Sequence, residues 1–218
     1  MIKAVLFDLD GTIINSEEGI TKCVQYALSC FGIEEPDRKK LLYFIGPPLD
    51  PVFREKYGFD ADKAWQAVLK YRERFDKTGI FECELYEGVA DTIRKLKEAG
   101  CVIALASSKP ETACRRILEH FSLTPYFDEI VGSTLDGSIS TKQQVLEELG
   151  RRMEHMQITK DEMCLIGDTE YDVIGADQFG IRCVGVSYGF GKREQLERAG
   201  AYCVCDSMAE VVDALQQM

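Results

Sequence analysis

The chain has 218 residues, 45% of them hydrophobic and 29% charged, a composition that allows one large core, or a core with a smaller domain, and excludes a disordered chain. Acidic residues outnumber basic ones by 37 to 26, for a formal net charge of −11, so the surface should repel nucleic acids and anionic membranes. The nine scattered cysteines indicate a reducing compartment, and no apolar run approaches the roughly 20 residues that span a bilayer. We therefore expect a cytoplasmic protein with no nucleic-acid or membrane partner; the composition does not indicate an oligomeric state.

Short β-rich runs alternate with segments of helical period along most of the chain. The runs span 3–7, 101–106, 129–132, 163–166, 183–186 and 202–205. Apolar residues recur at helical spacing within 89–96, 113–121, 145–153 and 211–215. This alternation predicts an α/β fold, a Rossmann-like parallel sheet with helices on both faces. In such folds ligands bind beyond the carboxyl ends of the strands.

The interval after the first strand contains no convincing strand and is predicted to be a helical insertion. Its first apolar stripe comprises Ile20, Val24, Ala27, Leu28 and Phe31. Its second comprises Ala61, Ala64, Trp65, Val68, Arg72 as an amphipathic stem, and Phe75. Gly46-Pro47-Pro48 predicts a turn between them. We expect a core of residues 1–15 and 82–218 and an α-helical cap of residues 16–81, with hinges at Asn15-Ser16 and Thr78-Gly79.

The first strand runs directly into Asp8-Leu9-Asp10-Gly11-Thr12. Strand alternation places Asp8 and Asp10 on the same side of the backbone, and two anions held together need a cation or a shared proton. A hard ion such as Mg²⁺ meets that need, and Gly11 allows a sharp turn close to a ligand. The alternative interpretation is a simple turn followed by a capped helix.

The second long strand is followed by Ser107-Ser108-Lys109-Pro110. Pro110 suits the first position of a helix, with a serine or Lys109 as its cap. A phosphate at this helix start would receive the Ser107 hydroxyl and the Ser108 backbone N–H. Helix capping alone is an equally good explanation of the serines.

A lysine and a second acidic group stand at two further helix starts. Lys142 is electrostatically misplaced against the helix dipole, which a role in neutralising a phosphoryl group would explain; a solvated surface lysine is the alternative. After the fourth strand, Asp168 is expected to complete a metal site. Asp172, four residues on and so on the same helical face, is expected to bind metal-bound water or to orient Lys142; helix capping accounts for one of these aspartates.

In this order, these residues resemble the four signature motifs of the haloacid dehalogenase superfamily. The resemblance implies a Mg²⁺-dependent phosphatase that acts on a small phosphorylated metabolite through an aspartyl-phosphate. Asp8 would be the nucleophile, and Asp10 would be the acid and then the base. Mg²⁺ would be held by the carboxylates of Asp8 and Asp168 and the carbonyl of Asp10, with Asp172 in support. The phosphoryl oxygens would be bound by Thr12, Ser107, Ser108 and Lys142.

Further stretches resemble the phosphoglycolate phosphatase and 5′-nucleotidase-like subgroup with an α-helical cap. They are Gly46-Pro47-Pro48-Leu49, Tyr86-Glu87-Gly88-Val89, 132–137 and 185–191. Candidate substrates are phosphoglycolate, a nucleoside monophosphate or a sugar phosphate. Asp10 argues against the dehalogenating branch, which has no carboxylate there, and no cap lysine has the context of the phosphonate-cleaving branch. The chain departs from many relatives at Asn15, where they carry an aspartate before the serine.

Two alternatives to hydrolysis remain within the resemblance. One is a phosphomutase, and the other is a phosphate-responsive regulatory protein that keeps Asp8 phosphorylated. Substrate selection is expected to lie in the cap, near 44–49 and at Arg54, Tyr71 or Arg72. Packing and solubility are the favoured explanation of each of these residues taken singly, but we expect at least one basic or aromatic cap residue to contact the substrate.

Overall fold

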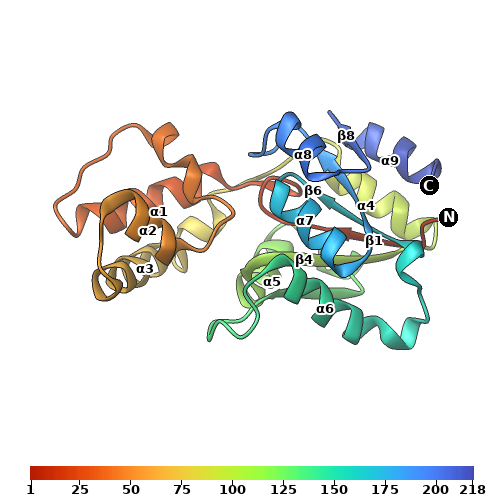
Figure 1. Cartoon of the computed structure of the whole chain (residues 1–218), viewed down its shortest axis with the longest axis horizontal. Helices are drawn as coiled ribbons and strands as arrows, with labels where there is room; N and C mark the ends of the chain where they lie inside the picture. The colour runs from red at the N-terminus through yellow and green to blue at the C-terminus, as the bar shows by residue number, and fades with distance from the viewer. The chain divides into compact units, whose positions relative to one another are not determined.

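The computed structural model describes all residues, 1–218, and divides them into two compact units (Figure 1). One unit comprises Met1–Ile14 and Leu85–Met218, and the other comprises Asn15–Glu84. The chain crosses between them within two short strands, β2 (Ile14–Asn15) and β3 (Glu84–Leu85), which pair with each other. None of the helices is both long enough and apolar enough to cross a membrane.

The larger unit is built on a six-stranded parallel sheet of order β5-β4-β1-β6-β7-β8. The strands are β1 Ala4–Phe7, β4 Val102–Pro110, β5 Glu129–Ser133, β6 Met163–Gly167, β7 Arg182–Val186 and β8 Cys203–Cys205. Each predicted strand is therefore confirmed, as is the α/β class. Strand β4 continues past its predicted end at Ala106, because Pro110 still pairs with Ser133 of β5.

Helices cover both faces of this sheet. They are α4 Val89–Glu98, α5 Glu111–His120, α6 Lys142–Met153, α7 Glu170–Phe179, α8 Arg193–Ala199 and α9 Met208–Gln216. One face packs its alternate strand residues, such as Leu6 and Leu165, against α6, α7 and α8. The other set, such as Phe7 and Ile103, is equally buried, and α4 and α9 pack against each other and against the strands. Short 3₁₀ helices span Thr124–Tyr126, Glu154–Met156 and Lys160–Glu162.

The smaller unit is helical. It contains α1 Glu17–Ser29, α2 Leu49–Tyr57 and α3 Ala61–Phe75, with 3₁₀ helices at Arg38–Phe44 and Gly79–Phe81. The stripe predicted for α3 is wrong in part, because Trp65 is 45% exposed and the Arg72 guanidinium lies over its ring. The buried stripe instead includes Ala67 and Tyr71, so the packed face of α3 is rotated away from Trp65.

The register of the sheet brings three strand ends to one edge. Phe7, the last residue of β1, pairs with Leu105 of β4 on one side and with Ile166 of β6 on the other. The Asp8 N–H continues this ladder by donating to the Ile166 carbonyl at 2.9 Å. The chain adds β4 and β5 on one side of β1 and then β6, β7 and β8 on the other side. The polar residues that follow these strands therefore meet at the point of reversal, where α/β sheets bind ligands.

Candidate active site

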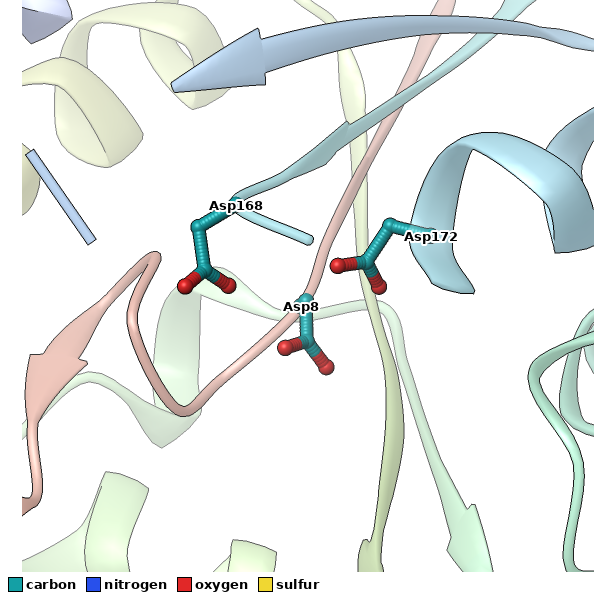
Figure 2. A group of neighbouring side chains, drawn as sticks. All are labelled: Asp8, Asp168 and Asp172. Carbon is teal, nitrogen blue, oxygen red and sulfur yellow. The ribbon is translucent and has the colours of Figure 1, made fainter. Parts of the chain in front are cut away.

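Three buried carboxylates meet at this edge of the sheet. Asp8 follows β1, Asp168 follows β6, and Asp172 lies in the first turn of α7 (Figure 2). One oxygen from each lies within 4.8 Å of the others, and Asp168 and Asp172 are almost fully buried. Hence the structure brings Asp8 next to two aspartates from which it is separated by more than half of the sequence.

Asp172 reaches this cluster by a route that the sequence did not predict. Asp168 precedes helix α7, whose N-cap is Thr169, so the expectation that Asp168 and Asp172 share a helical face is wrong. Asp172 instead closes a capping box, in which one of its oxygens accepts from the Thr169 N–H at 3.0 Å and from the Thr169 hydroxyl at 2.8 Å. This fixes the carboxyl group and leaves its other oxygen toward Lys142.

Lys142 connects two of the carboxylates. It is the first residue of α6, and the preceding Thr141 caps the helix. The Lys142 Nζ lies 2.7 Å from an Asp8 oxygen and 2.8 Å from an Asp172 oxygen, and it donates to the Ala106 carbonyl at 2.7 Å. Its side chain is only 5% exposed, so the surface-lysine alternative does not hold.

The electrostatics of the cluster follow from burial. Burial raises the pKa of Asp8 to about 6; Lys142 opposes this rise, and the charges of Asp172 and Asp10 add to it. Burial likewise raises the pKa of Asp168 well above its ordinary value, with the Asp172 and Asp8 charges adding to the rise. For Lys142, burial alone lowers the pKa, but Asp172 and Asp8 outweigh it and the net pKa is raised. Lys142 contacts Asp8 and Asp172 and supplies one positive charge against three carboxylates, which leaves the cluster short of positive charge.

Asp168 is held by two loops. The Thr12 hydroxyl donates to one of its oxygens at 3.4 Å, and the Phe190 N–H donates to the other at 2.8 Å. Gly11 has φ +83°, and a Cβ there would lie 2.0 Å from an Asp168 oxygen. A Cβ at Gly191 would lie 1.9 Å from the Asp168 carbonyl oxygen. The 185–191 stretch thus packs directly on Asp168, and Thr12 is engaged there, so its expected contact with phosphate stays a prediction.

The β4 end differs from the expectation in one respect. Pro110 has extended backbone and is the N-cap of α5, which begins at Glu111; the prediction of Pro110 as the first helical residue is wrong, because β4 is still pairing there. Ser107 is 2% exposed, and its hydroxyl accepts from the Lys109 N–H at 3.3 Å. Ser108 is partly buried.

Sequence reasoning missed the ion pair between Asp10 and Lys109. The Lys109 Nζ lies 2.8 Å from the Asp10 carboxylate, and the two side chains are 7% and 13% exposed. The sequence carried no usable signal for this pair, because the register of β4 shifts between Ala106 and Pro110 and the regular alternation of side chains is lost there. The apolar run ends at Ala106, so the sequence predicts a strand end there and a helix cap at Lys109.

Residues 5–186 match the family of haloacid dehalogenase-like hydrolases. The chain belongs to this family. The resemblance of the four motifs to this family is therefore confirmed. The expectation of a phosphatase is also confirmed, because the relatives of this chain include a 5′-nucleotidase and a predicted phosphatase.

Relatives of this hydrolase align over nearly its whole length. It is 39% identical over 212 residues to a 5′-nucleotidase of Pseudomonas aeruginosa, covering 97% of this chain and 95% of that protein. It is 30% identical over 213 residues to the tyrosine-protein kinase PtkA of Mycobacterium tuberculosis, covering 98% of this chain and 71% of that protein. A crystal structure described as a predicted phosphatase from Clostridium acetobutylicum has a TM-score of 0.93 at 44% identity, and each chain is covered completely.

The donor set of this hydrolase fits a hard divalent cation. Asp8, Asp168 and Asp172 offer only oxygen ligands. Mg²⁺ and Ca²⁺ prefer oxygen ligands, whereas softer metals prefer nitrogen or sulfur ligands. The raised pKa values of Asp8 and Asp168 indicate that the cluster would be stabilised by a further positive charge. The residues present therefore suit the ion that the motifs imply.

Proposed function

We propose that this phosphatase is Mg²⁺-dependent and hydrolyses small phosphate monoesters by passing the phosphoryl group first to Asp8 and then to water. The observation that carries the proposal is the placement of Asp8 at the carboxyl end of β1, 2.7 Å from Lys142 and beside two further buried carboxylates. Nucleoside 5′-monophosphates are the proposed substrate class, because the 5′-nucleotidase relative aligns over 97% of the chain.

Asp8 is proposed as the nucleophile. One of its oxygens would form a bond to phosphorus while the bond from phosphorus to the ester oxygen breaks, which replaces one difficult displacement by two easier ones. Lys142 would hold the attacking carboxylate in place and reduce the repulsion between two anions. Because Asp172 also contacts Lys142, Asp172 would orient this ammonium.

Asp10 is proposed as the acid and base. It would give its proton to the departing ester oxygen in the first step. In the second step it would take a proton from the water whose oxygen displaces Asp8 from phosphorus. Ser107, through its hydroxyl, and Ser108, through its N–H, are proposed to bind phosphoryl oxygens together with Lys142.

Mg²⁺ would be held by the carboxylates of Asp8 and Asp168 and the backbone carbonyl of Asp10, with Asp172 in support. When bound, the ion supplies charge neutralisation for the phosphoryl group. We further propose that residues 16–81 cap the site and select the substrate, which assigns specificity to a segment outside the carboxylate cluster.

The test is phosphate release from a panel of nucleoside 5′-monophosphates, phosphoglycolate, sugar phosphates and pyrophosphate, with MgCl₂ or with EDTA. The variants are Asp8→Asn and, as a matched control, Asp213→Asn, which changes an exposed aspartate of α9. We expect magnesium-dependent release that Asp8→Asn abolishes and Asp213→Asn preserves, with nucleoside monophosphates turned over best.

The covalent step has its own readout. After incubation with p-nitrophenyl phosphate, whose phenolate leaves without a proton, acid-quenched Asp10→Asn protein should carry one phosphoryl group by intact mass. Hydroxylamine should remove this group, which persists because the variant lacks the base that hydrolyses the intermediate. Transfer of the phosphoryl group to a sugar instead of to water would support the phosphomutase alternative. Lasting phosphorylation of the wild-type Asp8 without phosphate release would support the regulatory alternative.

A further inference from the structure

Lys109 makes a nearly buried contact with Asp10 that the proposed mechanism has not used. Its Nζ lies 2.8 Å from both Oδ1 and Oδ2 of Asp10. The two residues come from different strand ends, since Asp10 follows β1 and Lys109 belongs to β4. A buried ammonium is costly unless it is paired, and this one is paired with the proposed acid and base.

The backbone around Lys109 explains how the side chain reaches this position. Ala106 of β4 pairs with Val131 and Pro110 pairs with Ser133, so four steps along β4 oppose two along β5 and the strand is irregular between these pairs. Such a bulge redirects the side chains of the residues within it. The Lys109 N–H also donates to the Ser107 hydroxyl at 3.3 Å. The end of β4 therefore carries both a proposed phosphate ligand and the partner of Asp10.

We propose that Lys109 is a positioning residue that fixes the Asp10 carboxyl group for proton transfer, an inference that rests on the proposed function. A carboxylate has about four acceptor sites, and an ammonium equidistant from the two oxygens occupies those between them. The outer sites stay available to the ester oxygen in the first step and to water in the second. Asp10 donates its proton as the bond from phosphorus to the ester oxygen breaks, and it regains a proton from the attacking water.

The nature of the leaving group distinguishes this role from direct binding of phosphate. A residue that acts through the acid matters only where the leaving group needs a proton. A residue that binds the phosphoryl group affects all esters alike, because each carries the same phosphoryl group. The dependence of kcat/KM on the leaving group therefore distinguishes the two roles.

The experiment compares kcat/KM for a nucleoside 5′-monophosphate, whose alkoxide leaves poorly, with kcat/KM for p-nitrophenyl phosphate, whose phenolate leaves without a proton. The variants are Lys109→Met, Lys109→Arg and the control Lys97→Met, which removes a lysine paired with Asp128 on the same unit. We expect Lys109→Met to lower the nucleotide value by about 10²-fold, the effect of misplacing a reacting group by about 1 Å, and to leave the p-nitrophenyl value nearly unchanged. Lys109→Arg should recover most of the loss, and Lys97→Met should change neither value.

A double-mutant cycle completes the test. If Lys109 acts through Asp10, the Asp10→Asn and Lys109→Met pair should lose no more than Asp10→Asn alone. Equal losses for both esters in Lys109→Met, or fully additive losses in the pair, would overturn the proposal, as would an unchanged nucleotide value. Should Lys109→Met not fold, Lys109→Gln takes its place, and equal losses for both esters in that variant would overturn the proposal as well. Failure of the wild type to release phosphate from any ester would instead refute the proposed function.

Discussion

Replacing the proposed nucleophile should abolish the Mg²⁺-dependent activity and should make the metal-free protein more stable at neutral pH. In the folded chain, burial raises the pKa of Asp8 from 3.8 to about 6, against the opposing effect of Lys142. Above pH 6 the folded protein must keep this carboxylate charged in a site that disfavours the charge. Asparagine has nearly the same shape and resembles the protonated acid, so Asp8→Asn should remove the cost.

The size and sign of this effect follow from linkage. A carboxyl group whose pKa is raised by folding binds more protons in the folded state, so stability falls as pH rises from about 4 to about 6. At about 1.4 kcal/mol per pH unit, the rise in pKa corresponds to roughly 3 kcal/mol at pH 7.5 and to about half of that at pH 5. For a chain of this size, 3 kcal/mol is about 6–12 °C in Tm.

The assay is thermal unfolding in EDTA at pH 7.5 and pH 5, followed by circular dichroism, for wild type, Asp8→Asn and the exposed control Asp213→Asn. We expect Asp8→Asn to have the higher Tm at pH 7.5, a gap that narrows at pH 5, and a control within about 0.5 kcal/mol of wild type. A variant that is less stable than wild type at pH 7.5, or a gap that does not change with pH, would refute the reasoning. It would mean that the ion pair with Lys142 outweighs the burial of the charge.

Three further predictions concern the same cluster. MgCl₂ at 100 times its Kd should stabilise the wild type by about 2.7 kcal/mol, and Asp168→Asn should lose this Tm shift in scanning fluorimetry; an equal shift in the variant would place the ion elsewhere. Lys142→Met should lower kcat by at least about 10²-fold in a phosphate-release assay with Mg²⁺, and near-normal turnover would exclude the role assigned to this ammonium. Gly191→Ala should cost about 1–3 kcal/mol by overpacking in thermal unfolding, because its Cβ would lie 1.9 Å from the Asp168 carbonyl oxygen. Gly185→Ala, whose Cβ meets only the flexible Leu196 side chain at 3.1 Å, should cost less, and equal costs would contradict this account.

Much of the active-site edge was predictable because a parallel sheet orders its strand ends. Each strand begins at one edge and ends at the other, so a polar residue directly after an apolar run must lie at the carboxyl edge. Asp8, Ser107 and Asp168 follow that rule, and Lys142 follows it at a helix start. The roles assigned to them remain predictions that the experiments above address.

Other features depend on which side of an element meets a neighbour. Trp65 and Val68 are both apolar residues of α3, but only Val68 faces the helices beside it. Helix α7 shows no clear apolar stripe in the sequence, because it carries Gly175, Ala176 and Asp172 among the residues it buries. Local periodicity cannot rank these faces, since burial is decided by the elements that pack against them.

The sequence by itself determined the alternation of strands and helices, the parallel sheet and the polar residues at its carboxyl edge, because these depend on local period and on the direction of the chain. Only the tertiary structure decided the partners of those residues. It placed Lys142 between Asp8 and Asp172, Lys109 against Asp10, and the Phe190 N–H on Asp168. Each pairing joins residues that are distant in the sequence and that only the fold brings into contact. Because a buried site has a low dielectric, these contacts then set the charge and the position of each group.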